Sequence, residues 1–326
     1  LEGVPCTRSD PKIRMTTKRS LKPFCKGFKM YTKEEYKKIY QGNLWKTALH
    51  ILRYNPRRFF KRVFLEFRFR YFQPVYRPSK TINGVIMRFD YQKDEKLQRM
   101  MYLGLYELGV TDIMRRFLKE GDTCIDAGAN VGYHTALGAG FVGKSGSVHA
   151  FEPVPEYFEK LKELANANRG HRIVLNQCAL GETTGSMKMY QIRTHRGERS
   201  FGTGSMFKDW LSNETVEATL EVPIMRLDAY VREKNLKNVK LLKVDVDGFE
   251  FPLLKGAEQF LRNQSPVIIS EIGHPIYARL GCTVNDLLEY MARLSYFPFD
   301  MVNLKKQLSK EEINREFINE VVFKKL

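Results

Sequence analysis

The feature that most constrains how this chain folds is a glycine-rich loop at residues 126–132, with the sequence Asp-Ala-Gly-Ala-Asn-Val-Gly. It directly follows a short apolar run at residues 123–126, which we predict to be a buried strand. Glycines let the backbone turn sharply and approach a ligand closely. In dinucleotide-binding folds the same turn seats a pyrophosphate at a helix N-terminus. Here Asp126 closes the strand and Asn130 replaces the middle glycine, and an acidic residue at that place suits a ligand with an ammonium group.

Strands and helices alternate along the chain from about residue 82 onward. This alternation predicts βαβ units and therefore an α/β fold with a doubly wound, mostly parallel sheet. The predicted strands are residues 84–89, 123–126, 173–178, 240–246, 266–272, 299–302 and 321–323. The predicted helices are residues 97–118 and 155–168, a helix between the strand at 240–246 and residue 261, and residues 283–294, with Thr283 as the cap of the last.

Two further acidic motifs follow predicted strands. Glu152, in the sequence Ala-Phe-Glu-Pro, ends the next strand 26 residues after Asp126, where a carboxylate can accept hydrogen bonds from both ribose hydroxyls of a nucleoside. Residues 243–250 read Lys-Val-Asp-Val-Asp-Gly-Phe-Glu at the end of another apolar strand. The carboxyl ends of parallel strands form the ligand crevice, so Asp245 is a candidate site residue. Asp247 and Glu250 fit equally well as acidic residues that cap the next helix.

The order and spacing of five segments resemble the FkbM-type methyltransferase family. The segments are residues 103–135, 151–168, 176–185, 222–231 and 241–258, and the similar region runs from about residue 102 to residue 302. The resemblance implies a seven-stranded class I methyltransferase fold of the Rossmann-like type, S-adenosylmethionine as the methyl donor, and an oxygen atom as the usual acceptor. Residues 1–80 are not explained by it.

The resemblance also implies roles for individual residues. The methionine end of the donor is expected against Asp126, Gly128, Asn130 and Gly132, the ribose at Glu152, and the adenine beside Gln177 to Ala179. Asp245 is expected where the donor meets the acceptor, and Glu250 belongs to the acidic strand-end motif of the family. His134 stands where the family often has a second aromatic residue, so this departure touches the donor loop.

Methyl transfer to a hydroxyl needs alignment of the acceptor and removal of its proton. The candidate bases are Asp245, Glu271 and His274, because Glu271 ends the strand at 266–272 and His274 follows in a Gly-His-Pro turn at the same rim. For His274 the alternative is a turn histidine without a catalytic role. Residues 191–219 form a long predicted connection between strands, which is a candidate lid over the acceptor or a surface loop.

Almost all of the net charge of +17 lies in residues 1–80, which carry 21 Lys and Arg but only 5 Asp and Glu. Residues 81–326, with 33 basic and 32 acidic residues, have the balance of an ordinary globular domain. We therefore predict a basic, partly helical N-terminal arm at 1–80 and a methyltransferase domain at 81–326. The five cysteines show no Cys-x-x-Cys spacing, so the sequence predicts neither a zinc site nor a disulfide framework, and favours a reducing compartment.

The arm leaves three interpretations open. The first is an active O-methyltransferase of small molecules or glycans, for which the arm has no evident use. The second is a methyltransferase-fold subunit of a ribonucleoprotein such as an organellar ribosome, docked through the arm onto RNA or a large protein complex and working with or without catalysis. A mitochondrial location belongs to this interpretation. The third is attachment of the aromatic and basic residues 56–72 to an anionic membrane surface, since no apolar run long enough to span a bilayer is present.

Overall fold

The computed structural model describes residues 79–89, 95–104, 106–193, 199–205, 215–273, 277, 280–314 and 318–326. Residues 1–78 of the predicted basic arm and the candidate base His274 lie outside the described residues. The predicted division of the chain at residue 80 therefore stays a prediction.

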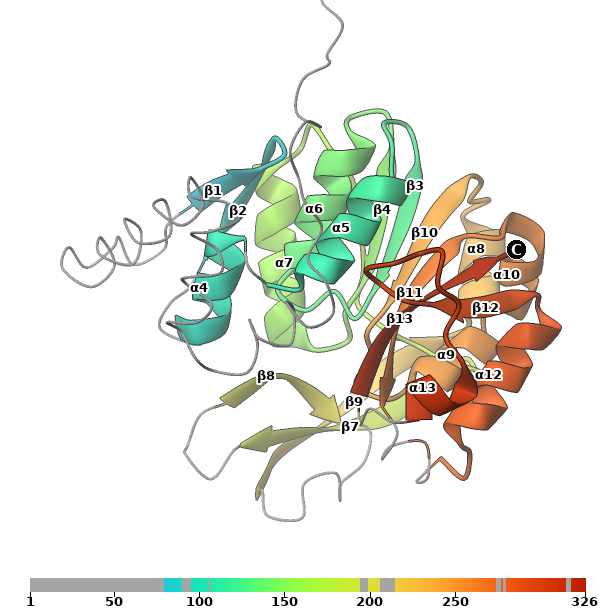
Figure 1. Ribbon diagram of the computed structural model, residues 1–326. Coiled ribbons are helices and arrows are strands. Elements are labelled where there is room, and N and C mark those ends of the chain that lie inside the picture. Colours follow the sequence, from blue (N-terminus) through green and yellow to red (C-terminus); the bar gives the residue numbers. More distant parts are fainter. Residues whose placement is uncertain are drawn as a thin grey trace, which may run out of the picture. The chain divides into compact units, whose positions relative to one another are not determined.

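A seven-stranded sheet forms the centre of the described domain, in the order β12-β13-β11-β10-β3-β4-β5 (Figure 1). Five of its strands run parallel, and β13 runs antiparallel to both β11 and β12. The strands are β3 (Thr123–Ala127), β4 (Ser147–Phe151), β5 (Arg172–Asn176), β10 (Val239–Val244), β11 (Val267–Gly273), β12 (Tyr296–Phe299) and β13 (Ile318–Lys325). The predicted fold class, an α/β doubly wound and mostly parallel sheet, is confirmed.

Helices cover both faces of this sheet because its strands are apolar on both sides. Successive residues of a strand point to opposite faces, so Cys124 packs in one core and Ile125 in the other. The first core is covered by α5 (Leu108–Phe117), α6 (Tyr133–Val142) and α7 (Pro155–Ala167). The second is covered by α8 (Leu227–Glu233), α9 (Glu250–Lys255), α10 (Glu258–Gln264) and α12 (Val284–Arg293). The helices α4 (Glu95–Leu103) and α13 (Lys310–Asn314) complete the described set.

Two smaller sheets adjoin the central one. The first pairs β1 (Ser79–Ile82) with β2 (Val85–Arg88). The second has the order β6-β9-β7-β8 and consists of β6 (Ala179–Leu180), β7 (Gly185–Arg193), β8 (Arg199–Ser205) and β9 (Thr215–Met225). The prediction of a long irregular connection at 191–219 is wrong for its described part, because those residues continue or form paired strands.

The local signals predicted most element positions. Thr283 caps α12 as expected: its hydroxyl accepts from the Asp286 N–H at 3.2 Å, and Asp286 accepts from the Thr283 N–H at 2.7 Å. The strand predicted at 299–302 lies earlier, at Tyr296–Phe299, because the chain turns where the Asp300 carboxylate accepts from the N–H groups of Val302 and Asn303. No helix among the described residues is long and apolar enough to cross a bilayer.

Candidate functional site

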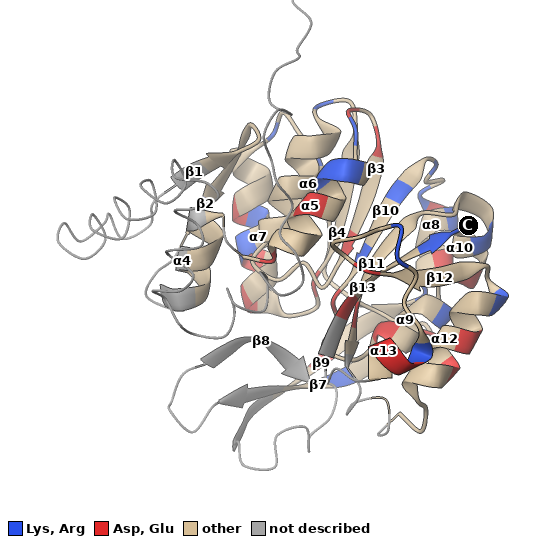
Figure 2. Ribbon diagram, viewed as in Figure 1, with Lys and Arg blue, Asp and Glu red and all other residues tan. Residues whose placement is uncertain are grey.

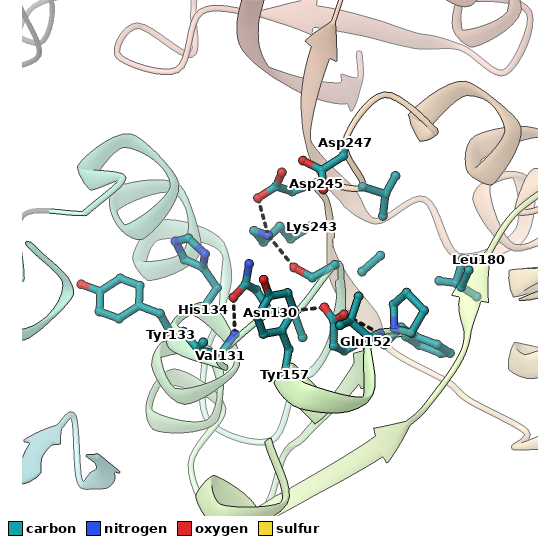
Figure 3. A pocket seen from close by; sticks show the side chains of 18 of the residues that line it. Asn130, Val131, Tyr133, His134, Glu152, Tyr157, Leu180, Lys243, Asp245 and Asp247 are labelled. Atoms are coloured by element: carbon teal, nitrogen blue, oxygen red, sulfur yellow. Dashed lines mark hydrogen bonds and ion pairs between the residues drawn. The ribbon is translucent and has the colours of Figure 1, made fainter. Parts of the chain in front are cut away.

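A pocket of about 330 Å³ lies at the carboxyl ends of the parallel strands. Its walls come from the loops that follow β3, β4 and β10, from β11, and from the segment before α5 (Figure 3). Strand β3 has β4 on one side and β10 on the other, so the chain order reverses here. Doubly wound sheets bind ligands at such a switch point, and the volume is in the range of small-molecule pockets.

The loop after β3 and the loop after β10 touch through Gly128. This residue has a φ of +77°, and a Cβ built on it would lie 1.7 Å from the carbonyl oxygen of Asp245. The Asp245 N–H donates to the carbonyl of Ala127 at 3.2 Å. Only glycine fits this approach of two backbones, which explains the first glycine of the motif.

The second half of the loop begins helix α6. Asn130 adopts a left-handed conformation with a φ of 51°, and its side-chain oxygen accepts from the N–H of Val131 at 2.7 Å. Gly132 precedes the helix with a φ of +89°, and a Cβ there would lie 2.9 Å from Leu161 and Leu164 of α7. Gly132 is not on the pocket wall, so it serves the packing of α6 against α7.

Glu152 holds the glycine-rich loop against the end of β4. One carboxylate oxygen accepts from the Asn130 N–H at 2.8 Å, and the other from the Val154 N–H at 2.9 Å. The side chain is 4% exposed and lines the pocket, as the ribose prediction requires. Burial raises the pKa of Glu152 to about 7, although the two N–H donors oppose the shift.

Asp126 lies beneath the loop and does not line the pocket. It is fully buried, accepts from the Thr135 hydroxyl at 2.6 Å, and lies 3.6 Å from the ammonium of Lys243. Burial raises the pKa of Asp126, although Lys243 opposes the shift. The structure therefore places Asp126 where it supports the loop and Lys243, with other residues forming the wall.

Lys243, at the end of β10, is the cation at the base of the pocket (Figure 3). Its ammonium donates to Asp245 at 3.0 Å and to the carbonyl of Gly128 at 3.4 Å. Burial by itself lowers the pKa of a lysine, but the carboxylates of Asp245 and Asp126 outweigh it and hold the pKa of Lys243 above its ordinary value. Lys243 is therefore a fixed positive charge that ties the β3 and β10 ends together.

The adenine prediction is met by its second residue only. Ala179 lines the pocket, whereas Gln177 is exposed and lies outside the pocket wall. Apolar side chains form this end, together with Met189 from β7 of the neighbouring sheet, and they are Phe151, Pro153, Val154, Cys178 and Leu180. An apolar slot beside Glu152 suits a planar base next to a ribose.

Carboxylates gather at the opposite end of the pocket. Asp247 and Glu271 line it, together with Asp245. Burial and then the negative charge of Asp245 raise the pKa of Glu271 to about 8. The same two causes hold the pKa of Asp247 well above its ordinary value. Glu250 is buried instead, and its carboxylate accepts from the N–H groups of Val246 and Gly248, so it shapes the loop.

Glu107 and His134 complete this acidic end. The His134 Nε2 atom lies 3.5 Å from a carboxylate oxygen of Glu107, and both residues line the pocket. Burial raises the pKa of Glu107 to about 8. Burial and the nearby Lys243 ammonium hold the pKa of His134 well below its ordinary value. His134 is thus part of the pocket wall, as predicted from its place in the loop.

Sequence reasoning missed two of these charged residues. Lys243 had a signal, since a lysine within an apolar strand needs a buried counter-charge. Glu107 had none, because it sits in a predicted helical segment and reaches the pocket only through a left-handed turn with a φ of 39° before α5. The aromatic side chains of Tyr106, Tyr133 and Tyr157 also line the pocket and were not predicted.

The residues of the pocket fit S-adenosylmethionine. The Glu152 carboxylate can take the ribose hydroxyls, the slot from Phe151 to Leu180 can take the adenine, and carboxylates face a ligand with sulfonium and ammonium groups. The space above Gly128 that a Cβ would fill gives the ligand close access to the loop backbone. Neutral and cationic parts of the donor thus meet walls of matching chemistry.

Comparison with known proteins identifies the family. A family model described as the methyltransferase FkbM domain matches residues 126–298, more than half of the chain. Hexuronic acid methyltransferase AglP of Haloferax volcanii is 26% identical over 191 residues, which cover 58% of this chain and 71% of that protein. The 31-O-demethyl-FK506 methyltransferase FkbM of Streptomyces tacrolimicus is 28% identical over 186 residues, which cover 50% and 70%.

Among solved structures, a methyltransferase FkbM from Methylobacillus flagellatus is similar with a TM-score of 0.38 and 14% identity. The similarity covers 72% of this chain and 56% of that one. The family match includes the loop at 126–132, Glu152 and the motif at 243–250, which are the segments that build the pocket. The chain therefore belongs to the FkbM methyltransferase family, with a class I methyltransferase fold and S-adenosylmethionine as its methyl donor.

Proposed function

We propose that this protein catalyses O-methyl transfer from S-adenosylmethionine to a hydroxyl acceptor, with Glu271 as the general base. The observation that carries the proposal is the position of Glu271 on the pocket wall beside Asp245. Within the described part of the chain its carboxylate has no hydrogen bond or ion pair. Asp245, in contrast, is bound to the Lys243 ammonium at 3.0 Å. A free carboxylate is better placed than a paired one to take a proton.

The other residues position the reactants. The donor supplies a methyl group that is already electrophilic on its sulfonium, so the protein mainly aligns the acceptor and removes a proton. Glu152 and the loop backbone orient the donor, and Lys243 keeps Asp245 fixed at the end of β10. Tyr106, Tyr133 and Tyr157 on the pocket wall exclude water from the reacting atoms.

Glu271→Gln should leave donor binding intact and lower the transfer rate by about 10²–10⁴-fold, the usual contribution of a general base. With the wild-type protein, the rate should fall as the pH drops through about 8, because Glu271 must be deprotonated to act. The cationic donor lowers that midpoint when it binds. The measurement is formation of S-adenosylhomocysteine with a panel of sugar glycosides and alcohols.

Glu159→Gln, at an exposed position on α7, is the matched control and should change neither rate nor pH profile. Donor binding without transfer to any hydroxyl would contradict the proposed activity and favour the non-catalytic interpretation. Transfer by Glu271→Gln at the wild-type rate would remove Glu271 from the mechanism.

We further propose that the basic arm, residues 1–80, binds RNA as part of a ribonucleoprotein, which includes a mitochondrial location. The excess of 21 basic over 5 acidic residues supports this proposal. Neutralised phosphates release counterions, so RNA affinity should fall with salt with a logarithmic slope of about −0.7 per contacted phosphate for a single strand. Replacing four arm residues with glutamine should flatten the slope, the four being Arg57, Arg58, Lys61 and Arg62.

The control for the arm replaces four exposed basic residues of the domain, Lys162, Lys234, Arg262 and Lys310, and should leave RNA binding unchanged. Binding to anionic vesicles in preference to RNA would contradict the proposal and favour membrane attachment. Fractionation of cells tests the location separately, and absence from mitochondria would overturn that part.

A further inference from the structure

The end of the pocket away from Glu152 carries more negative charge than its fixed cation balances. Among the described residues, four carboxylates line this end, and Lys243 is the only Lys or Arg that lines the pocket. The carboxylates belong to Glu107, Asp245, Asp247 and Glu271. They come from three parts of the fold, namely the turn before α5, the loop after β10, and β11.

Lys243 is already matched before any ligand is considered. Its ammonium lies 3.0 Å from Asp245 and 3.6 Å from the buried Asp126, so these two carboxylates outnumber the single positive charge. Figure 3 shows Asp245 and Asp247 on the same side of Lys243. No counter-charge therefore remains for the other carboxylates of this end.

Glu271 and Asp247 are the unmatched pair. In the described part of the chain, neither carboxylate has a hydrogen bond or an ion pair, and both face the pocket. Their pKa values are raised by burial and by each other's neighbours, which shows that they lack a cation rather than a proton. A positive charge placed between them would meet carboxylates that have no other partner.

His134 is an independent sign of an unfilled polar site here. Its side chain is 5% exposed, and its Nε2 atom has no hydrogen bond although it points toward Glu107 at 3.5 Å. Lys243 and burial disfavour a protonated ring, so His134 does not supply the missing positive charge. A buried polar atom without a hydrogen bond is uncommon and calls for a partner that binds at this place.

We propose that this end of the pocket is a cation-selective subsite, which holds a positive charge beside the transferred methyl group. The acceptor hydroxyl then belongs to a molecule with a neighbouring ammonium group, such as an amino sugar or an amino alcohol. A carboxylate or phosphate beside the hydroxyl would face Glu271 and Asp247 without a cation and is excluded. The inference rests on the proposed donor site and adds the class of acceptor.

Sinefungin and S-adenosylhomocysteine test the subsite directly. Sinefungin carries an amine-bearing carbon where S-adenosylhomocysteine has a neutral thioether, so the two differ in one positive charge at the position of the methyl group. Calorimetric titration near neutral pH should give a Kd for sinefungin at least about tenfold lower, because carboxylates in a partly buried pocket attract a cation strongly. The advantage should shrink by roughly fivefold in Glu271→Gln.

Asp247→Asn is the second variant, chosen because asparagine tolerates the left-handed conformation of residue 247, whose φ is 51°. It should also reduce the preference for sinefungin, while Glu159→Gln should not. Sinefungin binding no tighter than S-adenosylhomocysteine, or with an unchanged advantage in both variants, would overturn the subsite. Failure of both ligands to bind would instead overturn the proposed function.

The acceptor panel adds a second readout. Among glycosides of equal size, the amine-bearing sugar should be methylated faster than the neutral one, and the uronic acid slowest. A uronic acid that is the best acceptor would overturn the inference, even where sinefungin binds as expected.

Discussion

Gly128→Ala should remove S-adenosylmethionine binding almost completely while leaving a folded domain. The new Cβ would lie 1.7 Å from the Asp245 carbonyl oxygen, so the loops after β3 and β10 must separate. Misplacement of a binding group by about 1 Å can cost on the order of 10²-fold, and here both loops of the donor site move. Alanine also costs about 1–2 kcal/mol at a left-handed position, since the φ is +77°. Calorimetric titration and thermal unfolding measure the two effects.

Gly281→Ala provides the matched control for that variant. Its φ is +68°, but nothing lies within 4 Å of a Cβ built there. The two variants therefore share the cost of the left-handed backbone, and only Gly128→Ala has the collision. Equal donor affinity in the two variants would show that the contact between the loops does not shape the site.

The part of the site that the sequence predicted is the part encoded locally. The glycine-rich loop and Glu152 each directly follow a short buried strand, and the ends of parallel strands meet at one edge of the sheet. Asp245 and Glu271 were placed at the rim by the same reasoning, and both line the pocket. The roles within the loop were harder to assign, because a strand-end Asp126 can face the ligand or, as here, a buried lysine.

The remainder depends on tertiary contacts that periodicity does not contain. Glu107 reaches the pocket because one left-handed residue turns the chain before α5. Met189 reaches it from a strand whose antiparallel partner, β9, begins 22 residues after β7 ends. Residues 185–225 are polar and rich in turn-formers, so the propensity signal favoured a loop, and strand pairing overrode it.

Lys243→Met should destabilise the domain by about 3–5 kcal/mol, the usual cost of breaking a buried ion pair from one side. The ammonium is 3% exposed, and its loss leaves Asp126 fully buried without a cation. Methionine fills a similar volume, so the loss of packing is small. Chemical denaturation measures the free energy of unfolding, and the exposed Lys162→Met on α7 is the control.

The pH dependence of the Lys243→Met variant separates this explanation from a simple loss of packing. Burial already raises the pKa of Asp126, and removing Lys243 raises it further. A carboxyl group with a raised folded pKa binds more protons when folded, so the variant should be least stable above that pKa and should recover as the pH falls toward the unfolded value of about 4. Asp126→Asn in the same chain should restore much of the stability at neutral pH, because no buried charge then remains at the base of the loop. A loss that is independent of pH and is not relieved by Asp126→Asn would show that Lys243 stabilises the fold by packing alone.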